Sequence, residues 1–160
     1  MGLKPGTSAY MLAYAFAKSA ISLKQKINRN EKKYTKLKKY FTSEINKISF
    51  PDGKKFIINS NENCIPSIVS ISFPYFTGEH FAVLLDARGI FVSSKSACNL
   101  DNGEESKIIS ELRQKSGNKN EYISYGTVRF SFGENTTKGQ IKRVIKEIKH
   151  IIQNYKGVLY

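Results

Sequence analysis

One alternating segment constrains the fold more than any other part of the chain. In residues 65–73, apolar and small polar residues alternate, which places Val69 and Ile71 on one face of a β-strand. Ser70 and Ser72 then lie on the opposite face, because successive side chains of a strand point to opposite sides. The segment therefore predicts a sheet with one apolar face.

Helical segments lie on both sides of this strand in the sequence. Residues 9–22 and 34–48 read as helix, with a bend between them, and Thr77 and Thr136 are the expected caps of two later helices. The last helix carries one apolar stripe, formed by Ile141, Val144, Ile145, Ile148, Ile151, Ile152 and Tyr155. With further strands expected at 56–58, 90–93 and 127–132, we predict an α/β fold of the α+β type: a mainly antiparallel sheet with helices packed on one face.

Composition excludes several classes of protein. Apolar residues make up 40% of the 160 residues, which is typical of a globular chain, and no apolar run approaches the roughly 20 residues that span a bilayer. Two cysteines, Cys64 and Cys98, do not make a disulfide framework. We therefore expect no membrane partner and a reducing, cytoplasmic location.

The chain is strongly basic, with a net charge of +13. Nine basic residues lie between Lys18 and Lys39, against one acid, Glu31. Such a run predicts either a nucleic-acid-binding surface or a solvated helix face. We favour the solvated face because lysine dominates, whereas bidentate recognition of phosphates and bases favours arginine. A basic nucleic-acid-binding domain remains an alternative interpretation.

The segment 93–99, SSKSACN, is the strongest candidate for chemistry. It follows a short apolar run and precedes turn residues, so Cys98 is expected in a small polar loop at the end of a strand. Reactive cysteines are partly exposed and close to positive charge, and Lys95 lies three residues upstream. The pattern alone is compatible with a reactive thiol or with a small residue in a loop.

A second candidate is Arg129, in the middle of the strand expected at 127–132. Alternation places Arg129 and Ser131 on one face, with Phe130 and Phe132 on the other. A cation on a strand needs an anionic partner if it is withdrawn from water. That partner is either a carboxylate of the chain itself or a carboxylate of a ligand.

The loop around Cys98 resembles the active-site loop of cysteine desulfurases, which belong to the class V aminotransferase superfamily of pyridoxal phosphate (PLP) enzymes. The matching residues are Ser93, Ser94, Ser96, Ala97, Cys98 and Ser106. Lys95 stands where the family has glycine. Gly78 and Glu79 resemble the family's helix start, and residues 128–133 resemble its RxSxG strand. Gly6 and Thr7 resemble a turn that reaches the cofactor phosphate of the partner subunit.

The resemblance implies a function. Cys98 would accept sulfur from L-cysteine as a persulfide, with release of alanine, for iron–sulfur clusters or thiolated tRNA. Arg129 would bind the substrate carboxylate, residues 94–97 would form the active-site loop, and Gly6 and Thr7 would contact the phosphate of PLP. The partners implied are L-cysteine, a sulfur-acceptor or scaffold protein and a second copy of the complete enzyme. No metal site is expected.

The resemblance also implies that part of the enzyme is missing. No segment resembles the family's PLP-binding lysine motif, so PLP would be held by a large domain that this chain lacks. We expect residues 1–25 to be the end of that domain and the start of a long connecting helix, and residues 26–160 to be the small C-terminal domain. The chain is expected to be inactive in isolation. A non-catalytic interaction module, or one that only accepts persulfide, is the alternative.

Overall fold

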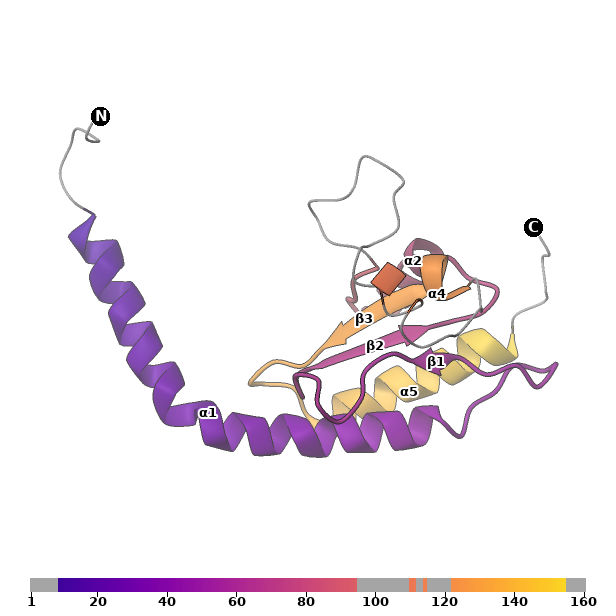
Figure 1. Cartoon of the computed structure of the whole chain (residues 1–160), viewed down its shortest axis with the longest axis horizontal. Helices are drawn as coiled ribbons and strands as arrows, with labels where there is room; N and C mark the ends of the chain where they lie inside the picture. Colours follow the sequence, from indigo (N-terminus) through magenta and orange to yellow (C-terminus); the bar gives the residue numbers. More distant parts are fainter. Residues whose placement is uncertain (1–8, 95–109, 112–113, 115–121, 155–160) are drawn as a thin grey trace, which may run out of the picture.

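The described part of the chain is built around a three-stranded sheet in the order β1 (Ile57–Ile58), β2 (Ile68–Ser72) and β3 (Thr127–Ser131) (Figure 1). Both neighbouring pairs are antiparallel, as predicted. The structure is a computed structural model that describes residues 9–94, 110–111, 114 and 122–154. The helices whose bounds the structure describes are α1 (Tyr10–Ile45), α2 (Gly78–Asp86), α4 (Tyr122–Tyr125) and α5 (Lys138–Gln153).

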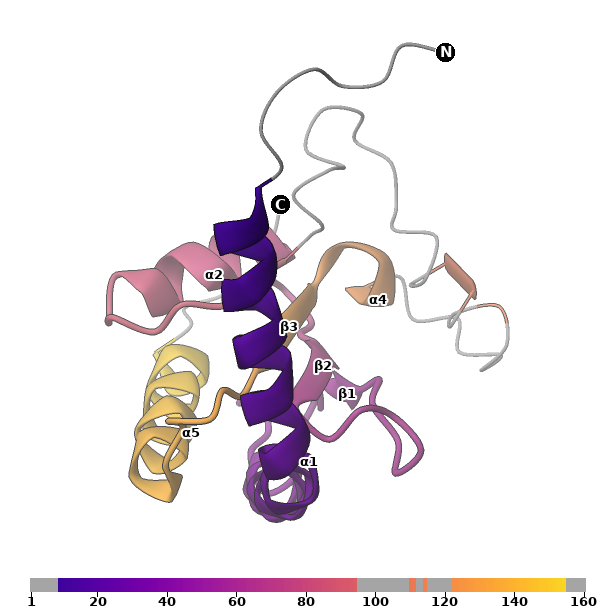
Figure 2. The same ribbon diagram turned by 90° about the vertical axis from the view of Figure 1, so that its left-hand side faces the viewer.

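Helices α1, α2 and α5 pack on the apolar face of the sheet. The ring of Phe41, in α1, lies 5.1 Å from that of Phe130, and the ring of Phe81, in α2, stacks on that of Phe73 at 4.0 Å. Helix α5 contributes Ile141, Ile148, Ile151 and Ile152 to the same core. Figure 2 shows α2 and α5 on the same side of the strands. The predicted α+β fold with helices on one face is therefore confirmed.

The two later helices begin with side-chain caps. The hydroxyl of Thr77 accepts the backbone N–H of His80 at 3.2 Å, as expected for α2. The cap of α5 is Thr137, which forms a capping box with Gln140, and the prediction of Thr136 was wrong by one residue. The Thr136 hydroxyl accepts the N–H of Gly133 instead, at 2.8 Å. That bond closes the turn after β3, so the helix begins one residue later.

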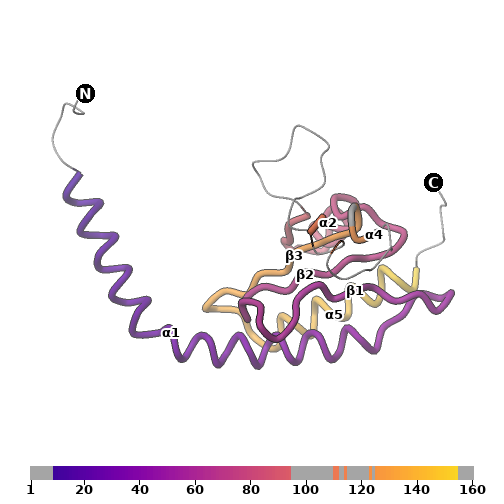
Figure 3. Tube along the Cα trace, in the orientation of Figure 1, coloured from indigo at the N-terminus to yellow at the C-terminus, as the bar shows by residue number. Residues whose placement is uncertain are grey.

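The N-terminal segment forms one long helix where two were predicted. Helix α1 bends, and its first part extends away from the rest of the chain (Figure 3). Residues 9–25 are all exposed, Lys26 is half-buried, and the first fully buried residue of the helix is Leu37. The exposed stretch carries large apolar side chains, among them Tyr10, Met11, Leu12, Tyr14, Phe16, Ile21 and Leu23. The rest of the described chain does not cover this stretch.

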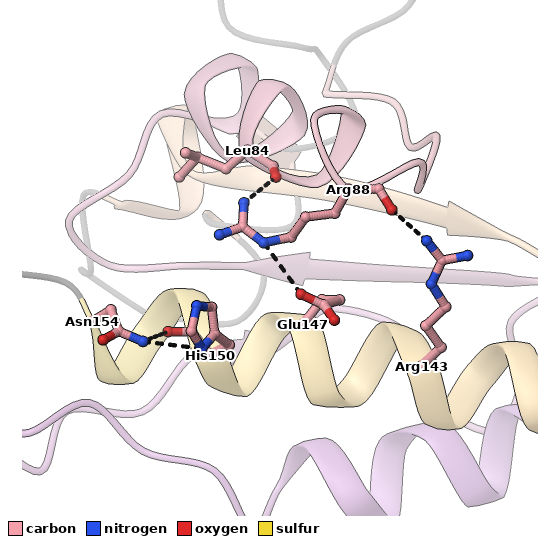
Figure 4. Close-up of polar contacts among 6 residues, drawn as sticks. All are labelled: Leu84, Arg88, Arg143, Glu147, His150 and Asn154. Atoms are coloured by element: carbon pink, nitrogen blue, oxygen red, sulfur yellow. Dashed lines mark hydrogen bonds and ion pairs between the residues drawn. The ribbon is translucent and has the colours of Figure 1, made fainter.

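Polar contacts fix the end of α2 against α5 (Figure 4). Arg88 forms an ion pair with Glu147 at 3.2 Å and donates to the carbonyl of Leu84 at 2.7 Å. Arg143 donates to the carbonyl of Arg88 at 2.6 Å. The segment that continues from Gly89 towards the predicted loop therefore starts from a fixed position. None of the helices in the described ranges is long and apolar enough to cross a membrane.

Candidate functional site

The face of the sheet opposite α1, α2 and α5 carries Arg129. Phe130 and Phe132 on the neighbouring positions are buried, whereas Arg129 and Ser131 are exposed, so the predicted alternation of this strand is confirmed. Within the described residues, Arg129 forms no ion pair. Its guanidinium therefore has donors available for an external carboxylate.

Arg129 lies in a row of polar side chains that crosses three segments. In the backbone pairing of the sheet, Arg129 lies opposite Ser70 of β2 on one side and opposite Ser93 on the other. Paired residues of antiparallel strands project from the same face. The Arg129 guanidinium donates to the Ser93 hydroxyl at 3.2 Å, which holds the arginine beside the start of the predicted loop.

The strand expected at 90–93 is reduced to one bridge at Ser93. The backbone N–H of Arg129 donates to the Ser93 carbonyl at 2.7 Å, and the N–H of Ser93 donates to the Arg129 carbonyl at 3.2 Å. Phe91, two residues earlier, is 84% exposed. The loop segment thus joins the edge of β3 at a single point, next to Arg129.

Gly78 allows the start of α2 to approach this site closely. A Cβ atom at Gly78 would lie 2.4 Å from the carbonyl oxygen of Thr127 and 3.0 Å from the Cβ of Ser94. A glycine is therefore required here for steric reasons, without any need for a positive φ angle. Helix α2, the beginning of β3 and Ser94, the first residue of the predicted loop, meet at this point.

Hydrogen bonds hold the other end of the polar face. The hydroxyls of Ser72 and Thr127 lie 2.6 Å apart, and Asn59 donates to Ser72 at 2.8 Å. Thr127 also donates to the carbonyl of Ile123 at 2.7 Å. The polar side chains at this end satisfy one another, whereas the row around Arg129 faces outward.

Most residues of the predicted loop lie outside the described residues. These are Lys95, Ser96, Ala97 and Cys98, together with Gly6 and Thr7 of the predicted phosphate contact. The structure therefore places Arg129 and Ser94 but not the candidate nucleophile. Cys64 is an exposed free thiol whose Sγ lies 3.3 Å from the Asn61 amide oxygen.

The described residues do not by themselves fit PLP. Among the described residues, the buried charged residue is Lys38. Its ammonium donates to the backbone carbonyls of Asn61 and Cys64 at 2.8 and 3.3 Å. It holds the segment before β2 and is not available to bind an aldehyde. In the described ranges, no three His, Cys, Asp or Glu side chains gather in a way that could hold a metal ion.

Sequence reasoning found Arg129 but missed the residues that position it. Strand alternation placed Ser70 on the polar face of its own strand. Only the register between β2 and β3 shows that Ser70 pairs with Arg129. The role of Ser93 as a hydrogen-bond partner depends on a contact across 36 positions of sequence. No local pattern carries that information.

The sequence of this chain is similar to those of known proteins. The family model for class-V aminotransferases matches residues 1–144. The cysteine desulfurase NifS of Azotobacter vinelandii is 33% identical over 103 residues, which are 64% of this chain and 24% of that protein. The cysteine desulfurase IscS of Dictyoglomus turgidum is 27% identical over 132 residues, or 82% of this chain and 32% of that protein.

Solved structures show the same fold. A NifS-like protein superposes with a TM-score of 0.71 at 21% identity, over 94% of this chain and 35% of its own. A NifS-like protein from Rickettsia africae gives a TM-score of 0.69 at 20% identity, over 92% of this chain and 36% of its own. The chain therefore spans between a quarter and about a third of the length of such relatives.

Proposed function

Because the chain belongs to the class-V aminotransferase family, we propose that it is the C-terminal portion of a PLP-dependent cysteine desulfurase. The complete enzyme would take sulfur from L-cysteine for iron–sulfur clusters or tRNA thiolation, in the cytoplasm. Its relatives named above are cysteine desulfurases, which supports this choice within the family.

One observation carries the proposal. An exposed arginine without an ion pair in the described part of the chain lies beside Ser93, where the segment leading to Cys98 begins. A planar cation on a rigid strand binds a carboxylate in two parallel hydrogen bonds. Four residues separate Ser93 from Cys98, which is enough chain to bring a thiol back to a substrate held at Arg129.

The roles of the residues follow from this arrangement. Arg129 binds the carboxylate of L-cysteine, and Ser93 orients the guanidinium. The Cys98 thiolate attacks the substrate sulfur, so an S–S bond forms while the Cβ–S bond of the substrate breaks and its carbon takes up a proton, giving alanine. Lys95 favours the thiolate form of Cys98. PLP, which stabilises the carbanion in this chemistry, would be held by the part of the enzyme that this chain does not span, with Gly6 and Thr7 of a second subunit at its phosphate.

The exposed stretch of α1 fits the same proposal. We propose that residues 1–25 belong to the end of the large domain and the start of the connecting helix, and that residues 26–160 form the small domain. Residues 9–25 expose apolar side chains that a larger domain would cover, and Lys26 is the first residue of α1 that is partly buried.

The test is reconstitution of the enzyme with a PLP-binding large domain, either from the coding sequence upstream of Met1 or from a relative. We expect alanine and sulfide from L-cysteine with both parts present, and neither product nor a PLP absorbance band with this chain alone.

Cys98→Ala should abolish sulfur transfer, whereas the matched variant Cys64→Ala should retain it. Turnover that survives Cys98→Ala would refute the assignment. Persulfide accepted by Cys98 without turnover would indicate the sulfur-accepting module instead.

A further inference from the structure

A basic hollow lies between α1 and the start of α5, on the helical side of the domain and away from Arg129. It has a volume of about 560 Å³, and its cationic lining is Arg29, Lys32, Lys33, Lys36 and Lys138. Leu37 and Tyr40 provide an apolar floor. Two helices that are distant in sequence thus combine their positive charges at one place.

Few of these charges are compensated within the domain. The Arg29 guanidinium forms an ion pair with the Glu134 carboxylate at 3.3 Å, and the Lys33 ammonium donates to the Glu134 backbone carbonyl at 2.6 Å. Lys32, Lys36 and Lys138 form no ion pair with any described residue. Like charges that are held close together repel one another, so an anionic ligand would relieve that repulsion.

The composition of the hollow favours a protein ligand over a nucleic acid. The Lys138 ammonium lies 4.5 Å from the centre of the Tyr40 ring, so that ring face is already occupied and cannot stack on a base. The apolar floor adds a contact that an amphipathic peptide can use and a phosphate backbone cannot.

The spacing indicates the form of the ligand. Arg29, Lys32 or Lys33, and Lys36 recur on one side of α1 at steps of three to four residues, so their side chains are roughly 5–6 Å apart. Carboxylates at positions i, i+4 and i+7 of a second helix have the same spacing. We propose that this hollow, formed by α1 and α5, docks an acidic amphipathic helix of a partner protein, with an apolar side chain inserted over Leu37.

The experiment measures binding of a fluorescent peptide to the full chain by anisotropy. The peptide carries Glu at i, i+4 and i+7 and Leu at i+3, and a second peptide has Ser in place of that Leu. Lys32→Gln combined with Lys36→Gln should weaken binding about tenfold. The matched variant, Lys142→Gln with Lys149→Gln, removes the same charge from exposed positions of α5 outside the hollow, and we expect about a twofold change or less. Circular dichroism of each variant confirms that the helices are retained.

Three results separate the interpretations. Weaker binding of the Ser peptide, together with the selective loss in the Lys32/Lys36 variant, supports the docking site. Equal losses in the two lysine variants would show that only overall charge matters and would overturn the proposal. Tighter binding of a single-stranded RNA of equal charge, with the same dependence on Lys32 and Lys36, would overturn it in favour of a nucleic-acid surface. All of these measurements are independent of desulfurase activity, so the docking proposal and the proposed function can fail separately.

Discussion

At the scale of single residues, two arginines differ in their burial and in their partners. Arg129 is exposed and hydrogen-bonds to the Ser93 hydroxyl. Arg88 is more enclosed, with its side chain 30% exposed, and it joins α2 to α5 through Glu147. Arg129 therefore keeps guanidinium N–H donors available for a ligand, whereas Arg88 uses its donors inside the fold.

Replacement of these arginines should therefore have different effects on stability. Arg129→Ala should change the free energy of unfolding of this chain by less than about 1 kcal/mol, as for ordinary surface substitutions. Arg88→Ala, the control, should cost about 1–2 kcal/mol, because it breaks the contacts to Glu147 and the Leu84 carbonyl. Urea unfolding measures both values. A loss of several kcal/mol for Arg129→Ala would show a structural arginine and remove the basis for its substrate role.

At the scale of elements, the position of α2 depends on a glycine that touches a strand. Gly78→Ala places a methyl group 2.4 Å from the Thr127 carbonyl, so α2 or β3 must move, at a cost of about 2 kcal/mol or more. Gly139→Ala is the matched control, since its Cβ would meet Thr137 at an ordinary 3.8 Å and alanine favours a helix. Thermal unfolding should show a clear loss in the first variant and none in the second. Equal Tm values would contradict the close packing described for α2.

A second element-scale contact, at Glu134, predicts a pH dependence. The Lys26 ammonium, 2.9 Å away, lowers the pKa of Glu134 below its ordinary value of 4.5. A lowered folded pKa contributes stability above the ordinary pKa, and this contribution is lost as the pH falls through the folded value. Glu134→Gln should thus lower Tm slightly at neutral pH, and the difference from wild type should close below pH 4.5.

The control for this measurement is Glu44→Gln. Glu44 pairs with Lys47 at the end of α1, so it links no two elements and its effect on Tm should be smaller. A Glu134→Gln difference that persists unchanged at acid pH would show that the charge of Glu134 is not responsible.

At the scale of the whole molecule, α1 belongs to the described core only in its second part. Deletion of residues 1–25 should leave the Tm within a few degrees of the full chain, because residues 9–25 are exposed and contribute nothing to the core. The truncated chain should also bind less of the hydrophobic dye ANS, since the exposed apolar side chains are removed. Loss of cooperative unfolding after the deletion would show that this stretch supports the domain.

Elements with a local signal could be predicted from the sequence alone. Alternation in β2 and β3 separated an apolar face from a polar one, and it placed Arg129 opposite Phe130 because side-chain direction along a strand has a fixed period of two. The stripe in α5 and the hydroxyl cap of α2 were equally readable. The family resemblance added a prediction that periodicity could not, namely a sulfur-accepting role for Cys98.

Contacts between segments that are distant in sequence could not be predicted and are visible only in the folded chain. The pairing of Ser93 and Ser70 with Arg129, the approach of Gly78 to Thr127 and the shared basic hollow of α1 and α5 depend on packing between elements. The cap at Thr137 and the single helix α1 also followed from context, because adjacent threonines and a polar stretch are compatible with more than one boundary. A local pattern fixes which way a side chain points, but its partner is selected by the register of the sheet and by the helices packed on it.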